Sequence, residues 1–287
     1  MKFSINTNAL RKNYSVEEIA DVAAQAGAQG IEWGLSNIEN AASEAAAMQK
    51  ATQAAGLEIV SFINAGPLWK TDEIRRWSEA IAASGGHVMR VAHPWFAWDY
   101  NESIHQPDDF MTLVNMTREG LAKLMDMGKE FDIKYVMETH PGSCFASPLT
   151  VPWLLKDFDP RYCGLIFDPA NTILEGFVRL RGAVELMNDY IAYIHVKNLA
   201  FKETVNENGK HIFATERRTV DCGMLDYTEL MFALKLQKWD GWLSFEEFVN
   251  KDAQQIVTEV SNGIAHLKKC CAEAVDSLQE PFLTFNR

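Results

Sequence analysis

The sequence lacks any run of about 18 apolar residues, the length that a helix needs to cross a bilayer. It also lacks a charged n-region followed by an apolar segment at its start, so we expect neither a signal peptide nor a membrane anchor. Positive charge is scarce, because 27 Lys and Arg residues face 39 Asp and Glu residues, for a formal net charge of −12. Such a charge repels a phosphate backbone on average, which argues against general nucleic-acid binding.

Cysteine is rare and follows no pattern. The five cysteines are odd in number and no CxxC spacing occurs, so we expect reduced thiols in a cytoplasmic protein. A GxGxxG motif is missing after the first strand-like run, which removes the most common signature of dinucleotide binding.

What the chain does have is the composition of an ordinary globular protein, with 47% hydrophobic and 23% charged residues over 287 positions. Short apolar or β-branched runs alternate with longer amphipathic stretches. Eight of these runs are predicted to be strands: Lys2–Asn6, Gly30–Trp33, Glu58–Asn64, Val88–His93, Lys134–Thr139, Gly164–Asp168, Ala192–Val196 and Trp242–Glu246. Eight strands alternating with helices predict an α/β fold, a single (β/α)8 TIM barrel over residues 1–287 with a C-terminal tail at 276–287. An open doubly wound sheet is the alternative.

Local signals support the helices between these strands. Ser15 and Glu18 form a capping-box pattern, and Gly56 follows an alanine-rich helical stretch in the manner of a C′ glycine. Two connections are long, at 94–108 and 198–224. Both leave the C-terminal ends of strands, which is the face that carries function in such barrels.

Four polar residues lie at the ends of the last four predicted strands: Glu138, Asp168, His195 and Glu246. Burying a charged group at a strand end is costly unless it is paired or bound to a metal. Taken singly, Asp168 fits a simple Asp-Pro turn and His195 fits a core histidine. Consecutive strands of a closed barrel bring their ends together, so the set predicts one convergent site. Glu246 is preferred to Glu247 because it shares a strand face with Ser244.

Three carboxylates and one imidazole predict one divalent metal ion, with Mn²⁺ as the first choice and Zn²⁺, Mg²⁺ or Co²⁺ as alternatives. Carboxylates held together raise one another's pKa, and a cation offsets their repulsion. We therefore expect metal affinity to increase with pH.

The motifs METHPG, FDPAN, IHVKN and LSFEEF, which surround these four residues, resemble the xylose isomerase-like TIM-barrel superfamily of sugar isomerases and epimerases. The segment DCGMLDYTELMFAL is similar to a Gly-x-x-Asp-Tyr stretch of that family. The resemblance implies that Glu138, Asp168, His195 and Glu246 bind one divalent cation. It also implies that the two glutamates move protons on opposite faces of a ketose. Asn171 departs from the pattern, since ketose epimerases of the family often have His there, and Asn198 stands where the family usually has Asp.

Further candidates surround this set and are predicted to bind substrate: His140, Asn171, Lys197, Glu32 and Arg90. His140 and Lys197 share strand faces with Glu138 and His195, so a second-layer contact or an ion pair with the carboxylates is the alternative for them. Glu32 and Arg90 fall late in their strands, and an ion pair between the two is the alternative to a substrate contact.

These features together predict a metal-dependent isomerase or epimerase that acts on a ketose, a sugar phosphate or a related polyol ketone through an enediolate. A lyase of the inosose or dehydroshikimate dehydratase type begins with the same α-proton abstraction and is the main alternative. An apurinic endonuclease shares the barrel but needs many histidine ligands, and a sugar-binding protein without activity is a further alternative. We expect a small carbohydrate as the partner, with no nucleic acid or membrane, and a possible homodimer or homotetramer.

Overall fold

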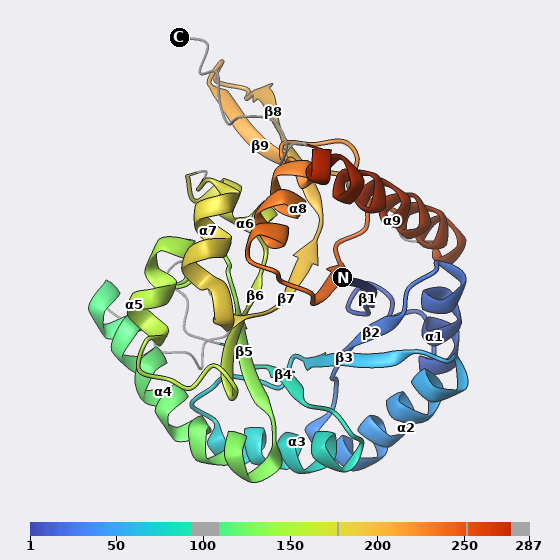
Figure 1. Cartoon of the computed structure of the whole chain (residues 1–287), viewed down its shortest axis with the longest axis vertical. Helices are drawn as coiled ribbons and strands as arrows, with labels where there is room; N and C mark the ends of the chain where they lie inside the picture. Colours follow the sequence, from blue (N-terminus) through green and yellow to red (C-terminus); the bar gives the residue numbers. More distant parts are fainter. Residues whose placement is uncertain (93–108, 177, 251, 277–287) are drawn as a thin grey trace.

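A computed structural model of the chain describes residues 1–92, 109–176, 178–250 and 252–276. Its centre is a closed barrel of eight parallel strands in the order β1-β10-β7-β6-β5-β4-β3-β2, surrounded by helices (Figure 1). The strands are β1 (Lys2–Asn6), β2 (Gly30–Gly34), β3 (Glu58–Ile63), β4 (Val88–Arg90), β5 (Lys134–Glu138), β6 (Cys163–Phe167), β7 (Ile191–Val196) and β10 (Trp242–Phe245). The predicted TIM barrel is confirmed, and every predicted strand region contains a barrel strand.

Helices lie between the barrel strands, as the alternation of runs in the sequence predicts. They are α1 (Val16–Gln25), α2 (Ala41–Ala54), α3 (Thr71–Ala83), α4 (Phe110–Phe131), α5 (Val151–Leu155), α6 (Pro169–Leu174), α7 (Leu180–Met187), α8 (Tyr227–Leu236) and α9 (Ala253–Asp276). Three short 3-10 helices are η1 (Ile38–Asn40), η2 (Pro148–Thr150) and η3 (Asn188–Tyr190). Ser15 and Glu18 form the predicted capping box at the start of α1, and Gly56 has the positive φ of a C′ glycine. None of the described helices is long and apolar enough to span a membrane.

The barrel interior is layered according to strand parity. Val136, Ile166 and Tyr193 belong to one buried apolar cluster, and each lies two residues before a predicted metal ligand on its own strand. Side chains two apart on a strand share a face, so this cluster forms a floor beneath the polar strand ends. Residues of the other parity, such as Phe3 and Ile5, pack in the larger core that includes the helices.

The connection at 198–224 contains a β-hairpin, and its prediction as a long loop is wrong. Strands β8 (Asn198–Val205) and β9 (His211–Arg218) pair antiparallel over eight residues each and project beyond the ring of helices (Figure 1). A turn over residues 206–209 joins the two strands. Gly209 has the positive φ that such a turn requires, and its backbone N–H donates to the Asn206 carbonyl. The predicted aromatic connection at 94–108 and the tail beyond residue 276 lie outside the described residues.

Candidate metal centre

The four predicted ligands come together at the C-terminal end of the barrel. Strands β5, β6, β7 and β10 are neighbours in the barrel, and Glu138, Asp168, His195 and Glu246 lie at or directly beside their ends. One potential ligand atom from each residue lies within 4.8 Å of those from the others, and the side chains are almost completely buried. Among the described residues, this is the one such group of three or more His, Cys, Asp and Glu side chains.

His195 lies at the middle of this group. Its Nδ1 is 3.1 Å from Glu138 Oε1 and 3.1 Å from Glu246 Oε1, while its Nε2 faces Glu32 Oε1 at 3.0 Å. Burial lowers the pKa of the imidazole, but the carboxylates of Glu246, Glu32 and Glu138 outweigh burial and hold it well above its usual range. These distances show that Nδ1 faces the candidate ligands Glu138 and Glu246, whereas Nε2 faces Glu32.

Two cationic side chains neutralise part of the acidic group. Arg90 Nη2 is 2.6 Å from Glu138 Oε2, and Lys197 Nζ is 2.8 Å from both Asp168 Oδ2 and Glu246 Oε1. Burial raises the pKa of Glu138, but the Arg90 charge together with the charge and hydrogen bond of His195 outweighs burial and brings that pKa down to about 2. Burial also raises the pKa of Glu246, and the charges of His195 and Lys197 overcome this and hold it well below its usual range.

Asp168 differs from the two glutamates. Burial raises its pKa well above the usual range despite the Lys197 charge, and the charges of Glu246 and Glu138 add to the increase. Its Oδ1 accepts the backbone N–H of Asn171 and so caps α6, a short helix that follows directly on the strand end. Its Oδ2 is buried beside Lys197 without accepting a hydrogen bond.

A divalent cation fits this donor set. Asp168 Oδ2 accepts no hydrogen bond and has only the Lys197 charge beside it, so it is an available ligand atom, and carboxylates with one imidazole suit the harder divalent metals. Charge also balances, because four buried carboxylates (Glu32, Glu138, Asp168 and Glu246) against Arg90 and Lys197 leave two formal negative charges when His195 is neutral. A 2+ ion would compensate them, which matters because uncompensated buried charge is costly.

Glu32 does not form the ion pair with Arg90 that the sequence leaves open as an alternative. Arg90 pairs with Glu138, and Glu32 is completely buried among other donors. Its carboxylate accepts hydrogen bonds from Tyr193 Oη at 2.6 Å and Ser244 Oγ at 2.7 Å, in addition to its contact with His195. The sequence separation of 163 residues between Glu32 and His195 hides this contact from a reading of the chain alone.

The remaining candidates flank the group. Asn171 is buried, and its Nδ2 donates to Glu138 Oε1 at 3.2 Å and to the Thr139 carbonyl at 3.1 Å. His140 is half-buried next to Pro141, and burial lowers the pKa of its ring. Lys197 is paired with the carboxylate cluster, which is one of the two roles that the sequence leaves open for it.

Glu246 and Glu247 are clearly distinguished. Glu246 enters the cluster, whereas Glu247 has a positive φ and a side chain that is 43% exposed, with Lys197 Nζ at 3.2 Å and Arg217 Nη2 at 3.2 Å. The preference for Glu246 from strand parity agrees with this geometry. Arg217 lies on the hairpin, so the hairpin base contacts the edge of the site.

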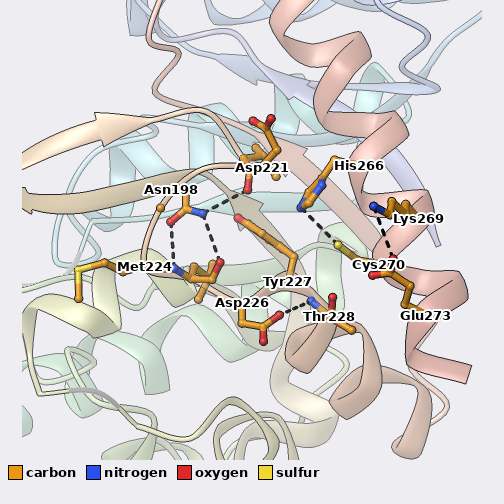
Figure 2. A pocket seen from close by; sticks show the side chains of 13 residues that line it. Asn198, Asp221, Met224, Asp226, Tyr227, Thr228, His266, Lys269, Cys270 and Glu273 are labelled. Atoms are coloured by element: carbon orange, nitrogen blue, oxygen red, sulfur yellow. Dashed lines mark hydrogen bonds and ion pairs between the residues drawn. The ribbon is translucent and has the colours of Figure 1, made fainter. Parts of the chain in front are cut away.

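Asn198 serves the hairpin and not the metal centre. Its Nδ2 donates to the carbonyls of Val220 and Leu225 at 3.2 and 3.3 Å, and its Oδ1 accepts the backbone N–H of Leu225 (Figure 2). A Cβ on Gly223 would meet this amide at 2.2 Å, so glycine is needed there. The adjoining cavity of about 310 Å³ lies between the hairpin base, α8 and α9, outside the metal centre.

Comparisons with known proteins support the fold. A family model described as xylose isomerase-like TIM barrel matches residues 20–270, and no curated protein sequence matches the chain. A crystal structure of D-psicose 3-epimerase in the presence of D-fructose has a TM-score of 0.72 at 16% identity, covering 94% of this chain and 99% of that one.

Two further solved structures match at similar levels. The probable 3-DHS dehydratase from Bacillus anthracis has a TM-score of 0.69 at 16% identity, covering 91% of this chain and 97% of that one. The IOLI protein with a bound zinc atom has a TM-score of 0.70 at 13% identity, covering 96% and 99%. At these identities the similarity is one of fold.

Proposed function

The chain belongs to the xylose isomerase-like TIM-barrel family, and from this premise we propose that it is a metal-dependent isomerase or epimerase of a ketose, a sugar phosphate or a related polyol ketone. The observation that carries the proposal is the placement of Glu138 and Glu246. They come from different strands, and their Oε1 atoms both lie 3.1 Å from His195 Nδ1. Two carboxylates directed at one point are what the transfer of a proton between two carbons, or between two faces of one carbon, requires.

In this proposal Glu138, Asp168, His195 Nδ1 and Glu246 hold one divalent cation. When bound, the cation supplies Lewis-acid stabilisation of the negative charge that develops on the substrate oxygens. Mn²⁺ is the first choice because three of the four ligands are carboxylates, with Zn²⁺, Mg²⁺ and Co²⁺ as alternatives. One structure of the same fold is described with a bound zinc atom, which is consistent with a divalent ion in this chain.

The protein's own groups account for the proton transfer. Both glutamates have pKa values below their usual range, so both are ionised at neutral pH and either can accept the proton next to a carbonyl. One glutamate takes the proton to give the enediolate and, once protonated, can return that proton to the neighbouring carbon. For delivery to the opposite face, the other glutamate must first take up a proton from solvent or from a substrate hydroxyl group. Lys197 and Arg90 keep the two carboxylates in position through contacts of 2.8 and 2.6 Å. Asn171 and His140 flank Glu138 and are the nearest candidates to donate to substrate hydroxyls.

A lyase is the second candidate, favoured by the similarity to a structure described as a dehydratase. It would use the same first step, with one glutamate removing the α-proton, after which that glutamate, now protonated, would give the proton to the departing hydroxyl group so that water leaves. The products separate the two reactions, because loss of water next to a carbonyl gives an enone that absorbs in the ultraviolet, whereas epimerisation does not.

The proposal also includes a small carbohydrate as the partner and a homo-oligomer of two or four chains. The hairpin supports an oligomer, since Phe201 and Phe213 are 44% and 65% exposed on the same face of an isolated two-stranded sheet. Five free cysteines are consistent with a reducing compartment such as the cytoplasm.

The test is exchange of solvent deuterium into ketoses by the metal-loaded protein. Six-carbon ketoses, their phosphates and an inosose are incubated in D₂O, and mass spectrometry and NMR detect label at the carbon next to the carbonyl. We expect one substrate to gain deuterium, and Glu138→Gln and Glu246→Gln each to lose most of that activity. Full activity in both variants would refute the proton-transfer roles.

A further inference from the structure

A cleft of about 500 Å³ is lined by residues at or just after the ends of β1, β2 and β3. These three strands lie next to one another in the barrel (Figure 1). Its lining residues are mainly polar: Asn8, Arg11, Lys12, Gly34, Leu35, Ser36 and Asn64. The volume falls within the range of small-molecule sites, and the C-terminal ends of strands are the functional face of such barrels. No residue predicted from the sequence as part of the site lines this cleft.

Asn6 lies on β1 next to Glu32 of β2 and contacts Asn8, which lines the cleft. It is the last residue of β1 and has the parity of Ser4, opposite to that of Phe3 and Ile5, so it faces the barrel interior. Its partner on β2 is Glu32, and the last β1–β10 pair, Ile5 with Phe245, precedes Asn6 by one residue. Asn6 therefore lies at the level of the ligands.

The side-chain amide of Asn6 is only half satisfied. Its Oδ1 accepts the backbone N–H of Asn8 at 2.9 Å, whereas its Nδ2 is buried without a hydrogen-bond partner. A buried polar group without a partner is rare and costly in a folded protein. Asn6 shares this property with Asp168 Oδ2 at the metal centre. An acceptor in the barrel mouth would satisfy the Asn6 donor.

Two further asparagines continue outward from Asn6. Asn64 Nδ2 donates to Asn8 Oδ1 at 2.8 Å, and both residues are exposed in the cleft. Asn64 has a φ of +68°, in the left-handed region, which asparagine adopts more readily than most other non-glycine residues. Gly34 makes room for the pair, since a Cβ there would approach Asn8 Oδ1 to 2.7 Å.

We propose that Asn6, Asn8 and Asn64, which we name the asparagine row, bind the hydroxyl groups of the part of the substrate that does not react. This inference rests on the proposed function. Amide groups are both donors and acceptors, so they suit the hydroxyls of a polyol chain. Arg11 in the cleft wall is paired with Glu44 at 2.6 Å, and Lys12 is the other cationic residue of the lining.

The test compares a long and a short substrate in matched variants. Asn6→Leu keeps the size of the side chain without its donor, and Asn64→Gly removes an amide while accepting the positive φ. For each we expect kcat/KM for the best six-carbon ketose to fall about tenfold, as for the loss of one hydrogen bond, and kcat/KM for three-carbon dihydroxyacetone to stay within about twofold. Asn208→Gly, on the exposed hairpin turn, is the control and should change neither value.

An equal fall in kcat/KM for both substrates, or no fall for the six-carbon ketose, would overturn the proposed role of the asparagine row. Metal content of each variant is measured in parallel, because an unchanged metal stoichiometry excludes damage to the adjoining centre. If wild-type protein exchanges deuterium into no ketose, the proposed function fails separately. Calorimetry with D-glucitol and glycerol then tests the asparagine row. The wild-type protein should bind D-glucitol more tightly than glycerol, and Asn6→Leu should lose this preference. Equal affinity of the wild-type protein for the two ligands would refute the asparagine row.

Discussion

Replacing Glu32 by Gln tests how the protein orients His195. The substitution keeps the shape of a completely buried side chain and removes one negative charge. Glu32 accepts from three groups, namely Tyr193, Ser244 and His195 Nε2. The pKa of the Tyr193 phenol is held well above its usual range by burial and by Glu32, so that phenol stays a donor. A glutamine has one carbonyl oxygen to offer, and its NH₂ group must then face a donor.

The expected effect is a loss of metal affinity. A carboxylate on the second nitrogen of a ligating histidine fixes the ring and its tautomer, and its removal typically weakens metal binding by about 10 to 100-fold. This corresponds to about 1.4 to 2.8 kcal/mol. One effect acts in the opposite direction, because loss of the Glu32 charge also lowers the His195 pKa and weakens competition by protons. Affinity is therefore compared across several pH values, up to the range where the His195 ring is neutral.

The assay is a titration of Mn²⁺ or Zn²⁺ against a competing chelator, for wild-type protein and Glu32→Gln. The control is Glu58→Gln at the start of β3, where an exposed glutamate pairs with Lys2. We expect the control to bind metal as the wild type does. If Glu32→Gln bound metal within about twofold of wild type at every pH, the role of Glu32 in orienting His195 would be wrong.

Three further outcomes are expected. The raised pKa of His195 means that a cation must displace the proton of this ring. Apparent metal affinity should therefore increase about tenfold per pH unit for each proton released, until pH passes that pKa, and calorimetry in buffers of different ionisation enthalpy should detect the release. A metal affinity that is flat from pH 5 to 8 would contradict this. Glu246→Gln should weaken metal binding by more than about a hundredfold while Glu247→Gln stays within about twofold, and equal effects would show that the wrong glutamate is assigned. Iodoacetamide at pH 8 should label exposed Cys222 and spare Cys163, because burial raises the pKa of the Cys163 thiol to about 12. Peptide mass spectrometry measures the labelling, and rapid labelling of Cys163 in the folded protein would disprove its burial.

The barrel could be predicted from the sequence because its strands are buried on both faces. Runs such as Val136–Met137 and Ile166–Phe167 are apolar at consecutive positions, which is typical of parallel sheets covered by helices. A polar residue at the end of such a run is conspicuous, and consecutive strands of a closed barrel bring these ends together. The four candidate ligands were therefore accessible to sequence reasoning.

The hairpin and α6 were not predicted, for different physical reasons. Strands β8 and β9 bury little of their surface, because almost all of their side chains beyond Leu199 are exposed, so hydrophobic periodicity gives a weak signal. Helix α6 is only six residues long, so it gives little periodic signal. It begins directly after Asp168, and the Asp168–Pro169 pair also fits a simple turn.

The contacts of Glu32 and Asn6 depend on strand register. Glu32 reaches His195 across 163 residues of sequence, and Asn6 lies beside Glu32 only because β1 pairs with β2 in one register. A shift of one residue would turn each side chain to the other face of the sheet. A single sequence does not specify that register, so these roles required the structure.

The central claim is that four strand ends form one metal centre, and a crystal structure of the protein soaked in Mn²⁺ tests it most directly. The account predicts one anomalous difference peak per chain, within bonding distance of Glu138, Asp168, His195 Nδ1 and Glu246. A peak bound by other residues, or no peak between these four side chains at saturating Mn²⁺, would contradict it.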